Sequence, residues 1–327
     1  MCKTSFVAQL NNKVYNSVAL RHTKKEEVPV GGTHEVIPMP DWHKINSKYI
    51  LEGELYLSFD FLDSWEKEVL ALNKNKEGAR YKYPESLIRF CSVLKVVFHL
   101  GYRQEQGALN SLKKWAPIPE VISYSQINRR MNLIGLDIVT SLANPKDGQI
   151  IAIDSTGIKL YNSGEWIREK HKKRKPFLKL HVAVNTKSNQ AVSLSITEDS
   201  VDDAKQLISL VRESEQYGAV SKVILDGAYD EYNIWEWLSN RSIHPVIRLR
   251  KDAIAKGLNA RARAVREKKR IGEDEWKKKH SYGQRWRVET WFSSYKRRFG
   301  EHCYSVKKEN IVQEVFLKAI ICNMLIK

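Results

Sequence analysis

The sequence predicts an α/β protein: a mixed sheet with helices on both faces, preceded by a smaller all-helical region. From Gly148 onward, short apolar segments with strand character alternate with helical segments. Two of them, residues 177–185 and 191–197, alternate with period two across the turn-forming stretch 185–190, which predicts an antiparallel hairpin. Before Gly148, apolar residues recur at helical spacing instead. Three antiparallel strands followed by alternating helices and strands indicate a mixed sheet.

Charge and hydropathy indicate the kind of partner. The 327 residues include 42% hydrophobic residues, enough for a substantial core, and carry a net charge of +17. Such a field suits nucleic acid first and an anionic membrane surface second. The longest apolar run, residues 316–326, contains Lys318 and is far shorter than the roughly 20 residues of a membrane span. We therefore expect double-stranded DNA as partner, with no membrane and no small-molecule substrate.

The termini and the cysteines predict a cytoplasmic, nucleoid-associated protein. The N-terminal stretch MCKTSFVAQLNNK lacks the apolar region of a secretory signal. Four cysteines are scattered without a CxxC pair, which favours reduced thiols over a structural zinc site. These are Cys2, Cys91, Cys303 and Cys322.

The first 145 residues contain an expected lead-in and an expected DNA-end-binding domain. Residues 1–40 show no sustained period and are expected to be irregular. Residues 41–145 are expected to be helical, with helices at 49–58, 61–72, from Pro84 to a stop at Gly101, at 103–115, and after residue 125. Ser125 is the expected N-cap of the last helix. The last two helices resemble a helix-turn-helix whose DNA contacts would be Gln126, Asn128, Arg129 and Arg130. The alternative is a helical bundle whose arginines face solvent.

Residues 146–327 are the expected catalytic domain. Its predicted elements are the strand 149–153, the hairpin, a helix at 203–213, a strand at 222–225, a helix at 232–239, a strand at 243–249 and a final helix at 311–326 that packs on the sheet. A basic insertion at about 252–280 interrupts this order. Residues 256–280 contain ten Lys or Arg residues but only four Asp or Glu residues, and they show no apolar stripe. We expect a loop that lies along a phosphate backbone, the alternative being a solvated charge run.

Residues 282–300, YGQRWRVETWFSSYKRRFG, carry a helical period. On a helical wheel, Tyr282, Arg285, Glu289 and Lys296 lie at about 0°, 300°, 340° and 320°. The expected apolar face lies beside this polar stripe and consists of Val288, Phe292, Tyr295 and Phe299. Glu289 is therefore expected at the edge of a core. The alternative is a solvated helix with a weak Arg285 to Glu289 pair.

Two further carboxylates stand where strands are predicted to end. Asp154 and Asp226 each follow an apolar strand, at the edge of an α/β sheet where ligands bind. Taken alone, each aspartate is better explained as a turn residue. Together with Glu289 they form a set of hard oxygen ligands that suits Mg²⁺ or Mn²⁺. Two such ions, about 3.5–4 Å apart, would stabilise the attacking and leaving oxygens of a phosphodiester.

These residues resemble the DDE transposases of prokaryotic insertion sequences. The resemblance rests on Asp154 in AIDSTG, Asp226 in LDGAYD, and the spacing Tyr-x2-Arg-x3-Glu-x6-Lys from Tyr282 to Lys296. The contexts STGIKLYNSGEW, KLHVAVN and RVETWFSSYKRRFG are similar to the group named for insertion sequence five. The segments DWHKINSKYILEGEL and YPESLIRFCSVLK extend the similarity upstream, so it covers most of the chain from about Asp41.

The resemblance implies an RNase H-like catalytic domain with Asp154, Asp226 and Glu289 as ligands of two Mg²⁺ or Mn²⁺ ions. It also implies that Tyr282, Arg285 and Lys296 contact DNA phosphates, and we expect the same of the helix residues Arg287, Arg297 and Arg298. The implied reaction is cleavage at the inverted-repeat ends of the element and transfer of the 3′-hydroxyl into target DNA. A homodimer would hold the two ends.

Three alternatives remain at this point. An RNase H-like endonuclease or Holliday-junction enzyme would share the carboxylates but would have less use for a helical DNA reader. A catalytically silent, transposase-derived DNA-binding regulator would not need all three carboxylates. A covalent Tyr or Ser recombinase is disfavoured because no Arg-His-Arg set surrounds a tyrosine.

Overall fold

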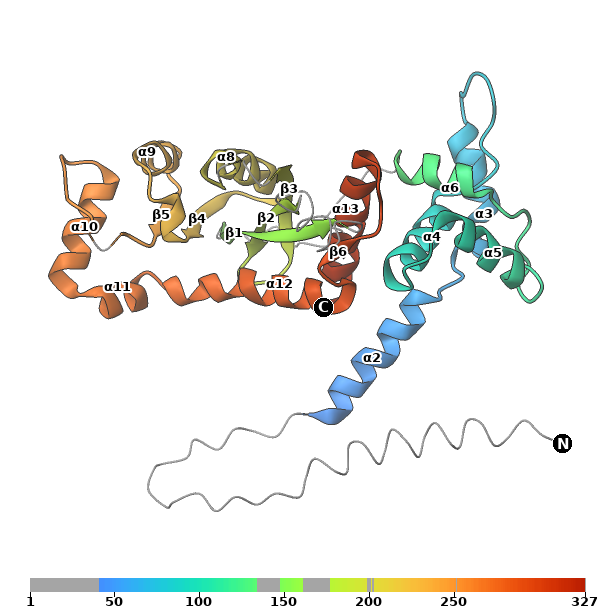
Figure 1. The fold of residues 1–327 in the computed structure, drawn as a ribbon, viewed down its shortest axis with the longest axis horizontal. Helices are drawn as coiled ribbons and strands as arrows, with labels where there is room; N and C mark the ends of the chain where they lie inside the picture. The colour runs from blue at the N-terminus through green and yellow to red at the C-terminus, as the bar shows by residue number, and fades with distance from the viewer. Residues whose placement is uncertain are drawn as a thin grey trace, which may run out of the picture. The chain divides into compact units, whose positions relative to one another are not determined.

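A computed structural model describes residues 41–133, 148–160, 177–198, 201, 203–250 and 252–326 (Figure 1). The chain divides into two compact units, residues 1–48 and 49–327. Helix α2 (Trp42–Tyr56) crosses this division and starts earlier than the helix predicted at 49–58. The lead-in predicted for residues 1–40 lies outside the described residues. The site is built within the second unit.

A mixed sheet forms the centre of the second unit. Its strand order is β3-β2-β1-β4-β5, and β6 pairs with the distal end of β1. Strands β1, β2 and β3 are antiparallel, whereas β4 and β5 run parallel to β1. This is the RNase H-like arrangement that the resemblance implied. The strands are β1 (Gln149–Leu160), β2 (Phe177–Asn185), β3 (Ala191–Glu198), β4 (Val220–Leu225), β5 (His244–Ile247) and β6 (His302–Cys303).

The predicted hairpin is confirmed, and its turn has a local cause. The Asn185 carboxamide oxygen accepts the backbone N–H groups of Lys187 at 2.9 Å and Ser188 at 3.1 Å. Asn189 then adopts a left-handed conformation with φ of 60°, which asparagine tolerates better than most residues. These side-chain bonds reverse the chain between β2 and β3.

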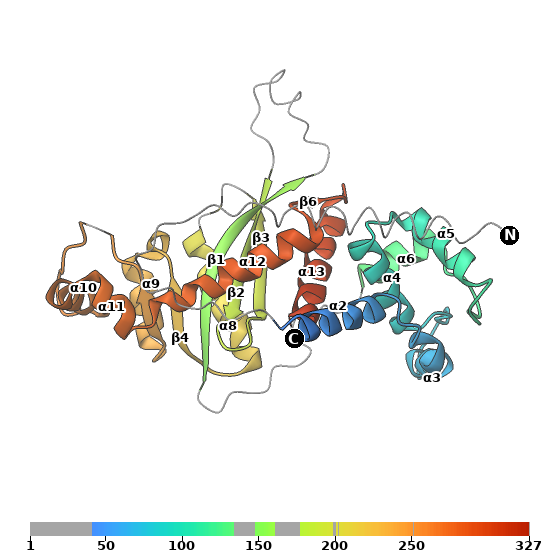
Figure 2. The same ribbon diagram turned by 90° about the horizontal axis from the view of Figure 1, so that it is seen from below.

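Helices cover both faces of the sheet, as predicted. Helix α12 (Trp286–Phe299) lies along one face against β1 and β2, whereas α8 (Asp203–Ser214) and α9 (Tyr232–Asn240) lie on the other (Figures 1 and 2). The buried residues of α12 comprise the whole predicted apolar face together with Trp291: Val288, Trp291, Phe292, Tyr295 and Phe299.

Helix α13 (Lys308–Leu325) packs on the sheet, as predicted for the C-terminal segment. The buried Asn323 side chain accepts from the Ala191 N–H at 2.9 Å and donates to the Ala191 carbonyl at 2.8 Å. Its oxygen also accepts from the Trp291 indole at 3.1 Å. One carboxamide thus joins the edge strand β3 to both α12 and α13.

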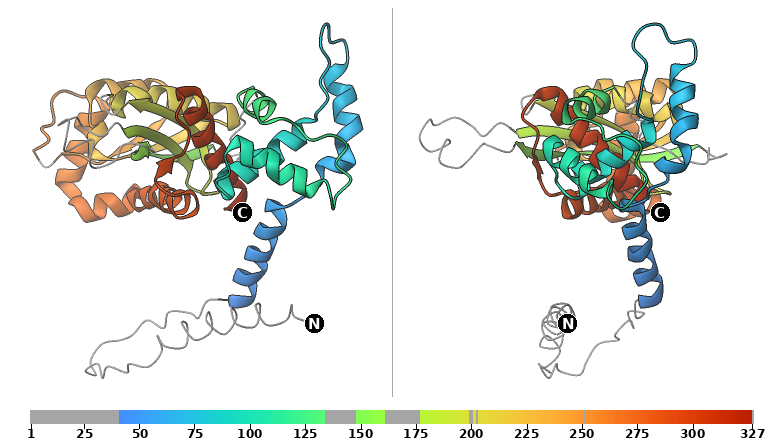
Figure 3. Two further views of the ribbon diagram at one scale, coloured as in Figure 1. Left: turned by 45° about the vertical axis from the view of Figure 1, so that its right-hand side comes forward. Right: turned by 90° about the vertical axis from the view of Figure 1, so that its right-hand side faces the viewer.

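Among the described residues, four further helices precede the sheet. They are α3 (Phe61–Asn73), α4 (Glu85–Val97), α5 (Tyr102–Leu112) and α6 (Tyr124–Met131). Helix α13 contacts both α4 and β3, so it connects these helices with the sheet (Figure 3). The Asn132 side chain also donates to the Asn310 side chain at 2.8 Å.

Two predicted helix boundaries in this region are wrong. Gly101 does not stop α4, because His99 already leaves the helix in a left-handed conformation with φ of 55°. Gly101 instead precedes α5 as its N-cap residue, with its N–H bound by the Gln104 side chain at 2.8 Å. Ser123, not Ser125, caps α6 through its hydroxyl, which accepts from the Gln126 N–H.

The loop predicted within the basic segment is also wrong, because helices α10 (Ala260–Ile271) and α11 (Glu273–Lys279) form there. Asn259 caps α10 by accepting from the Ala262 N–H at 2.8 Å. Gly272, with φ of 85°, separates the two helices. The buried anchors are few and widely spaced among charged residues, so no apolar stripe reveals them in the sequence: Arg261, Ala262, Val265 and Trp276.

Within the described ranges, Cys91, Cys303 and Cys322 are free and buried, whereas Cys2 lies outside them. No helix in the part of the chain that the structure describes is long and apolar enough to cross a membrane.

Candidate active site

The parallel pairing of β1 with β4 brings Asp154 and Asp226 to one level of the sheet. Ala152 pairs with Ile224, and each aspartate follows two residues later. The prediction that Asp154 ends its strand is wrong, because β1 continues to Leu160 while paired with β2. Only β4 ends here. The longer β1 therefore extends past the carboxyl edge of its parallel neighbour and carries Asp154 beside that edge.

The segment before α12 departs from the predicted single helix. Ser281 adopts a left-handed conformation with φ of 55°, Tyr282–Arg285 form one turn of 3-10 helix, and the α-helix begins only at Trp286. The i,i+3 hydrogen bonds of a 3-10 turn change the angular spacing assumed by the helical wheel. Tyr282 is consequently buried, and Arg285 stands at the start of α12.

Arg285 links two of the three predicted ligands. Its Nη1 donates to the Asp154 Oδ2 at 2.8 Å, and its Nη2 donates to the Glu289 carboxylate one turn further along α12. The predicted i,i+4 pair therefore exists, but its arginine also makes a contact between distant parts of the chain. The side chains of Arg285 and Asp154 are 21% and 26% exposed, whereas that of Glu289 is 54% exposed. The negative charge of Asp226 also acts on the site, because it raises the pKa of both Asp154 and Arg285.

The electrostatics of the site follow from burial. Burial raises the pKa of Asp154, and the nearby Asp226 adds to this, while the Ser155 N–H and Arg285 oppose it. Burial likewise raises the pKa of Tyr282 to about 12, so its phenol is protonated at neutral pH. Among the described residues the Tyr282 hydroxyl has no hydrogen-bond partner. It is thus a free donor beside two carboxylates.

The donor set fits a hard divalent cation. Asp154, Asp226 and Glu289 offer carboxylate oxygens only, and two of them, Asp154 and Glu289, pair with the Arg285 cation. As the described residues are placed, no three acidic, histidine or cysteine side chains form a ready metal cluster. The Arg285 guanidinium lies between Asp154 and Glu289 instead.

The other predicted cations of α12 differ in their freedom. Lys296 lies 3.5 Å from the Glu301 carboxylate, and Arg298 is held by Glu52 through two hydrogen bonds of 2.8 and 3.0 Å. Arg287 stacks over the Trp286 ring at 4.5 Å, and Arg297 is exposed. The structure therefore leaves Arg287 and Arg297 freer to meet a phosphate than Arg298.

A basic pocket adjoins the site, and sequence reasoning missed two of its residues. It has a volume of about 580 Å³. Trp286 is 50% exposed and shares this pocket with Arg248, which follows β5. No local signal connects Arg248 with the 282–286 segment, because only the fold brings them together. The residues that line this basic pocket include Arg248, Lys277, Lys278, Tyr282 and Trp286.

The four residues predicted to contact DNA from the helix-turn-helix differ in how far they are buried. Asn128 and Arg129 line a second pocket of about 720 Å³ between α5 and α6, together with Arg103. Gln126 is half-buried at the start of α6. Arg130 is buried, donates to the Tyr83 carbonyl at 3.2 Å and stacks on Tyr81. Arg130 thus has a structural position, whereas Asn128 and Arg129 reach the surface.

Comparisons with known proteins assign the chain to a family. The family model described as "Transposase DDE domain" matches residues 145–324, and a second model of the same description matches residues 52–163. Among solved structures, a piggyBac transposase synaptic complex with hairpin DNA matches with 9% identity over 85% of this chain and 74% of that chain, with a TM-score of 0.39. The Drosophila P element transposase strand transfer complex matches with 14% identity over 62% and 47% of the chains, with a TM-score of 0.33. Because the first family model spans more than half of the sequence, the chain belongs to the DDE transposase family.

Proposed function

We propose that this protein is the transposase of an insertion sequence of the insertion sequence five-like group, in a prokaryotic host. It would cleave DNA at the inverted-repeat ends of its element and transfer the resulting 3′-hydroxyl into target DNA. The observation that supports the proposal is that Arg285 pairs with both Asp154 and Glu289, while the charge of Asp226 raises the pKa of Asp154 and of Arg285. Their sequence positions match the DDE pattern, and their oxygens suit Mg²⁺ or Mn²⁺.

Asp154, Asp226 and Glu289 would hold two divalent ions, which would supply charge stabilisation for the attacking and leaving oxygens of the phosphodiester. The neighbouring residues would bind and orient the scissile phosphate. The Tyr282 phenol, protonated and free of protein partners among the described residues, would donate a hydrogen bond to a phosphate oxygen. In the absence of DNA, Arg285 balances the charge of Asp154 and Glu289. When DNA binds, its Nη2 would leave Glu289 and donate to a phosphate oxygen.

The surrounding surface supports DNA as the substrate. Lys296 would contact the backbone on the same side as Arg285, and the pocket of Arg248 and Trp286 would receive the adjoining strand. The groove between α5 and α6, with Asn128 and Arg129, would recognise the element end. The reaction needs both ends together, so we propose a homodimer in the DNA complex.

The test measures Mg²⁺-dependent nicking of a duplex that carries an element end, and strand transfer from an oligonucleotide with an exposed 3′-hydroxyl. Asp154→Asn, Asp226→Asn and Glu289→Gln should each abolish both reactions and retain DNA binding. Asp274→Asn is the matched control, because Asp274 is 94% exposed on α11 and should leave both reactions unchanged. A variant of the triad that still nicks in Mg²⁺ would remove that residue from the site.

The same assay separates the other candidate functions. Nicking without strand transfer would favour an RNase H-like endonuclease. DNA binding without nicking in either Mg²⁺ or Mn²⁺ would favour a catalytically silent regulator.

A further inference from the structure

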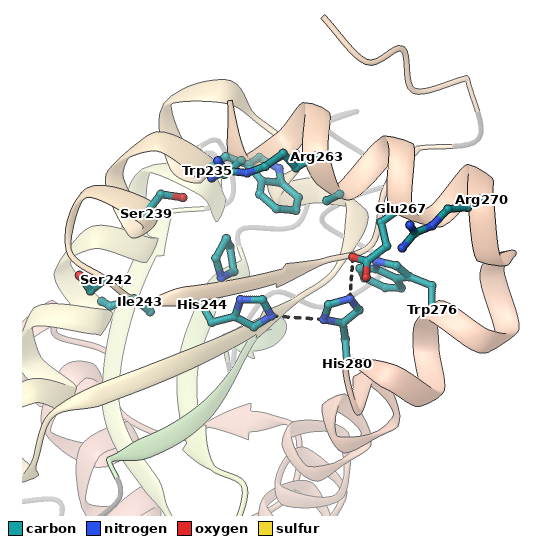
Figure 4. A pocket seen from close by; sticks show the side chains of 13 residues that line it. Trp235, Ser239, Ser242, Ile243, His244, Arg263, Glu267, Arg270, Trp276 and His280 are labelled. Carbon is teal, nitrogen blue, oxygen red and sulfur yellow. Dashed lines mark hydrogen bonds and ion pairs between the residues drawn. The ribbon is translucent and has the colours of Figure 1, made fainter. Parts of the chain in front are cut away.

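A third pocket, of about 480 Å³, is lined by His244 at the start of β5, the opposite end of this strand from the carboxyl edge of the sheet. Figure 4 shows the side chains that line it. The pocket is formed by the end of α9, the start of β5 and the helices α10 and α11. In the parallel pairing of β4 with β5, His244 is level with Lys222, four residues before Asp226. At about 3.3 Å per residue, this places the pocket roughly 13 Å along the sheet from the aspartate.

The pocket holds two arginines that no carboxylate neutralises among the described residues. Arg263 and Arg270 line it from α10, seven residues and thus two turns apart, on one side of the helix. Most other cations of the segment are paired within it or with nearby acids. These pairs are Arg261 with Asp230, Lys268 with Glu273, Lys277 with Glu273 and Asp274, Lys278 with Glu275, and Lys279 with Glu267.

Glu267, the one carboxylate among the described residues that line the pocket, is already compensated. Glu267 pairs with Lys279 and accepts from the His280 Nε2 at 3.0 Å (Figure 4). Because a carboxylate only accepts, the His280 Nε2 carries a proton, and the His280 Nδ1 forms a hydrogen bond of 3.2 Å with the His244 Nε2. Lys279 and His280 thereby compensate Glu267, and among the described residues the charges of the two arginines stay unpaired.

The remaining polar groups of the pocket include further donors. The Trp276 residue is 3% exposed, yet among the described residues its buried indole N–H has no acceptor. An unpaired buried donor destabilises the folded state, and a bound acceptor would satisfy it. The hydroxyls of Ser239 and Ser242 also line the pocket. Two guanidinium groups, an indole N–H and two hydroxyls together suit an oxyanion with several acceptor oxygens.

We propose that this pocket binds a phosphate group of the DNA backbone, at a contact distinct from the catalytic site. The proposal rests on the proposed function for the identity of the anion. Helix α11 contributes Trp276 and His280 to this pocket, and Lys277 and Lys278 to the basic pocket beside Tyr282. A helix of seven residues is about 10 Å long, so one DNA molecule can contact both pockets. Arg263 and Arg270 would thus hold DNA that extends away from the scissile phosphate.

The experiment compares two double variants of the full chain that remove the same charge from the same helix. All four residues of the two variants are exposed, but Arg263→Gln/Arg270→Gln changes residues that line the pocket, whereas Arg266→Gln/Lys269→Gln changes residues that do not. Affinity for a labelled duplex is measured by fluorescence anisotropy in EDTA over a range of salt concentrations. The pocket variant should bind about tenfold more weakly than wild type, with the slope of log K against log salt reduced by about two. The control variant should lose about twofold, with a slope change below one.

Trp276→Phe tests the pocket without changing charge. It should weaken duplex binding about threefold at every salt concentration and leave the salt slope unchanged, with folding checked by circular dichroism. Titration with deoxyadenosine monophosphate, followed by tryptophan fluorescence, tests a free nucleotide as the source of the phosphate. Saturable nucleotide binding that the pocket variant loses, with duplex binding equal to that of the control variant, would overturn the assignment to DNA.

The outcomes also separate this proposal from the proposed function. Equal losses of duplex affinity in the two double variants would overturn the proposal that the pocket binds a DNA phosphate. The proposed function would stand, because the wild-type protein would still bind DNA. Strand transfer by the wild type, lost in Asp154→Asn, tests the catalytic proposal independently, since the binding measurements contain no divalent metal.

Discussion

Arg285 and Asp154 lie 131 residues apart in the sequence and are joined by an ion pair of 2.8 Å. The contact connects α12 with the central strand β1. Because Arg285 also contacts Glu289, it connects two carboxylates that would otherwise repel each other at the sheet edge. The same arginine thus contributes to the fold and, under the proposed function, to DNA binding.

This pair predicts a measurable coupling. Asp154→Asn and Arg285→Gln should each lower the free energy of unfolding, and the double variant should lose less than the sum. We expect a coupling energy of about 1–2 kcal/mol, because both side chains are about three-quarters buried. Urea denaturation of the four proteins in EDTA measures it. Additive losses would show that the ion pair contributes nothing to stability.

Lys296 should contribute to DNA binding rather than to folding. It pairs only at 3.5 Å with Glu301, an exposed interaction of small value. Lys296→Ala should weaken binding to an element end and reduce the slope of log K against log salt by about one. Lys187→Ala, on the exposed β2–β3 turn, is the matched control and should change the slope less. An unchanged slope in Lys296→Ala would remove this residue from the DNA contacts.

The buried pair of Asp230 with Arg261 should hold α10 in place. The Asp230 side chain is fully buried and receives two hydrogen bonds of 2.7 Å from Arg261 and one of 3.0 Å from Trp235. Burial alone would raise the pKa of Asp230, but these hydrogen bonds outweigh it and lower the pKa. Arg261→Gln leaves this charge uncompensated and should cost about 3–5 kcal/mol in urea denaturation.

The double variant Asp230→Asn/Arg261→Gln is the control for that prediction. It removes the unpaired charge and should recover part of the loss. A single Arg261→Gln variant as stable as wild type would show that solvent reaches Asp230. The depressed pKa also means that the stability from this pair is present above the unfolded pKa of about 3.9 and declines as the pH falls through the folded value.

Glu105 should make stability fall as the pH rises. Its carboxylate is fully buried on α5 without a hydrogen-bond partner among the described residues, and burial raises its pKa to about 8, against the weaker opposing effect of Lys95. Between the unfolded pKa of about 4.3 and pH 8, the folded state binds more protons than the unfolded state. The free energy of unfolding therefore decreases with pH across this window.

Glu105→Gln should remove this dependence, with a stabilisation of a few kcal/mol at pH 8 that disappears near pH 4.5. Urea denaturation at several pH values checks it. Glu66→Gln, on the exposed side of α3, is the control and should follow the wild-type pH profile. Parallel profiles for wild type and Glu105→Gln would show that Glu105 ionises in the folded protein at the same pH as in the unfolded chain.

The basic segment shows why some of the fold escaped sequence reasoning. Its helices α10 and α11 depend on a buried Arg261 that pairs with Asp230, thirty-one residues away. A charged residue normally predicts a solvent-exposed face, and only its distant partner reverses that expectation. The same applies to Arg130, which was expected to face DNA but packs on Tyr81.

The sequence by itself determined the alternation of strands and helices, the β2–β3 hairpin and the apolar face of α12, because these depend on local periodicity and turn chemistry. It also determined which carboxylates match the DDE spacing. Only the tertiary structure decided that Asp154 and Asp226 share one level of the sheet, that Arg285 lies between Asp154 and Glu289, and that Arg263 and Arg270 line a pocket with Trp276. Strand register and long-range ion pairs join segments many residues apart, and no local pattern records their distances.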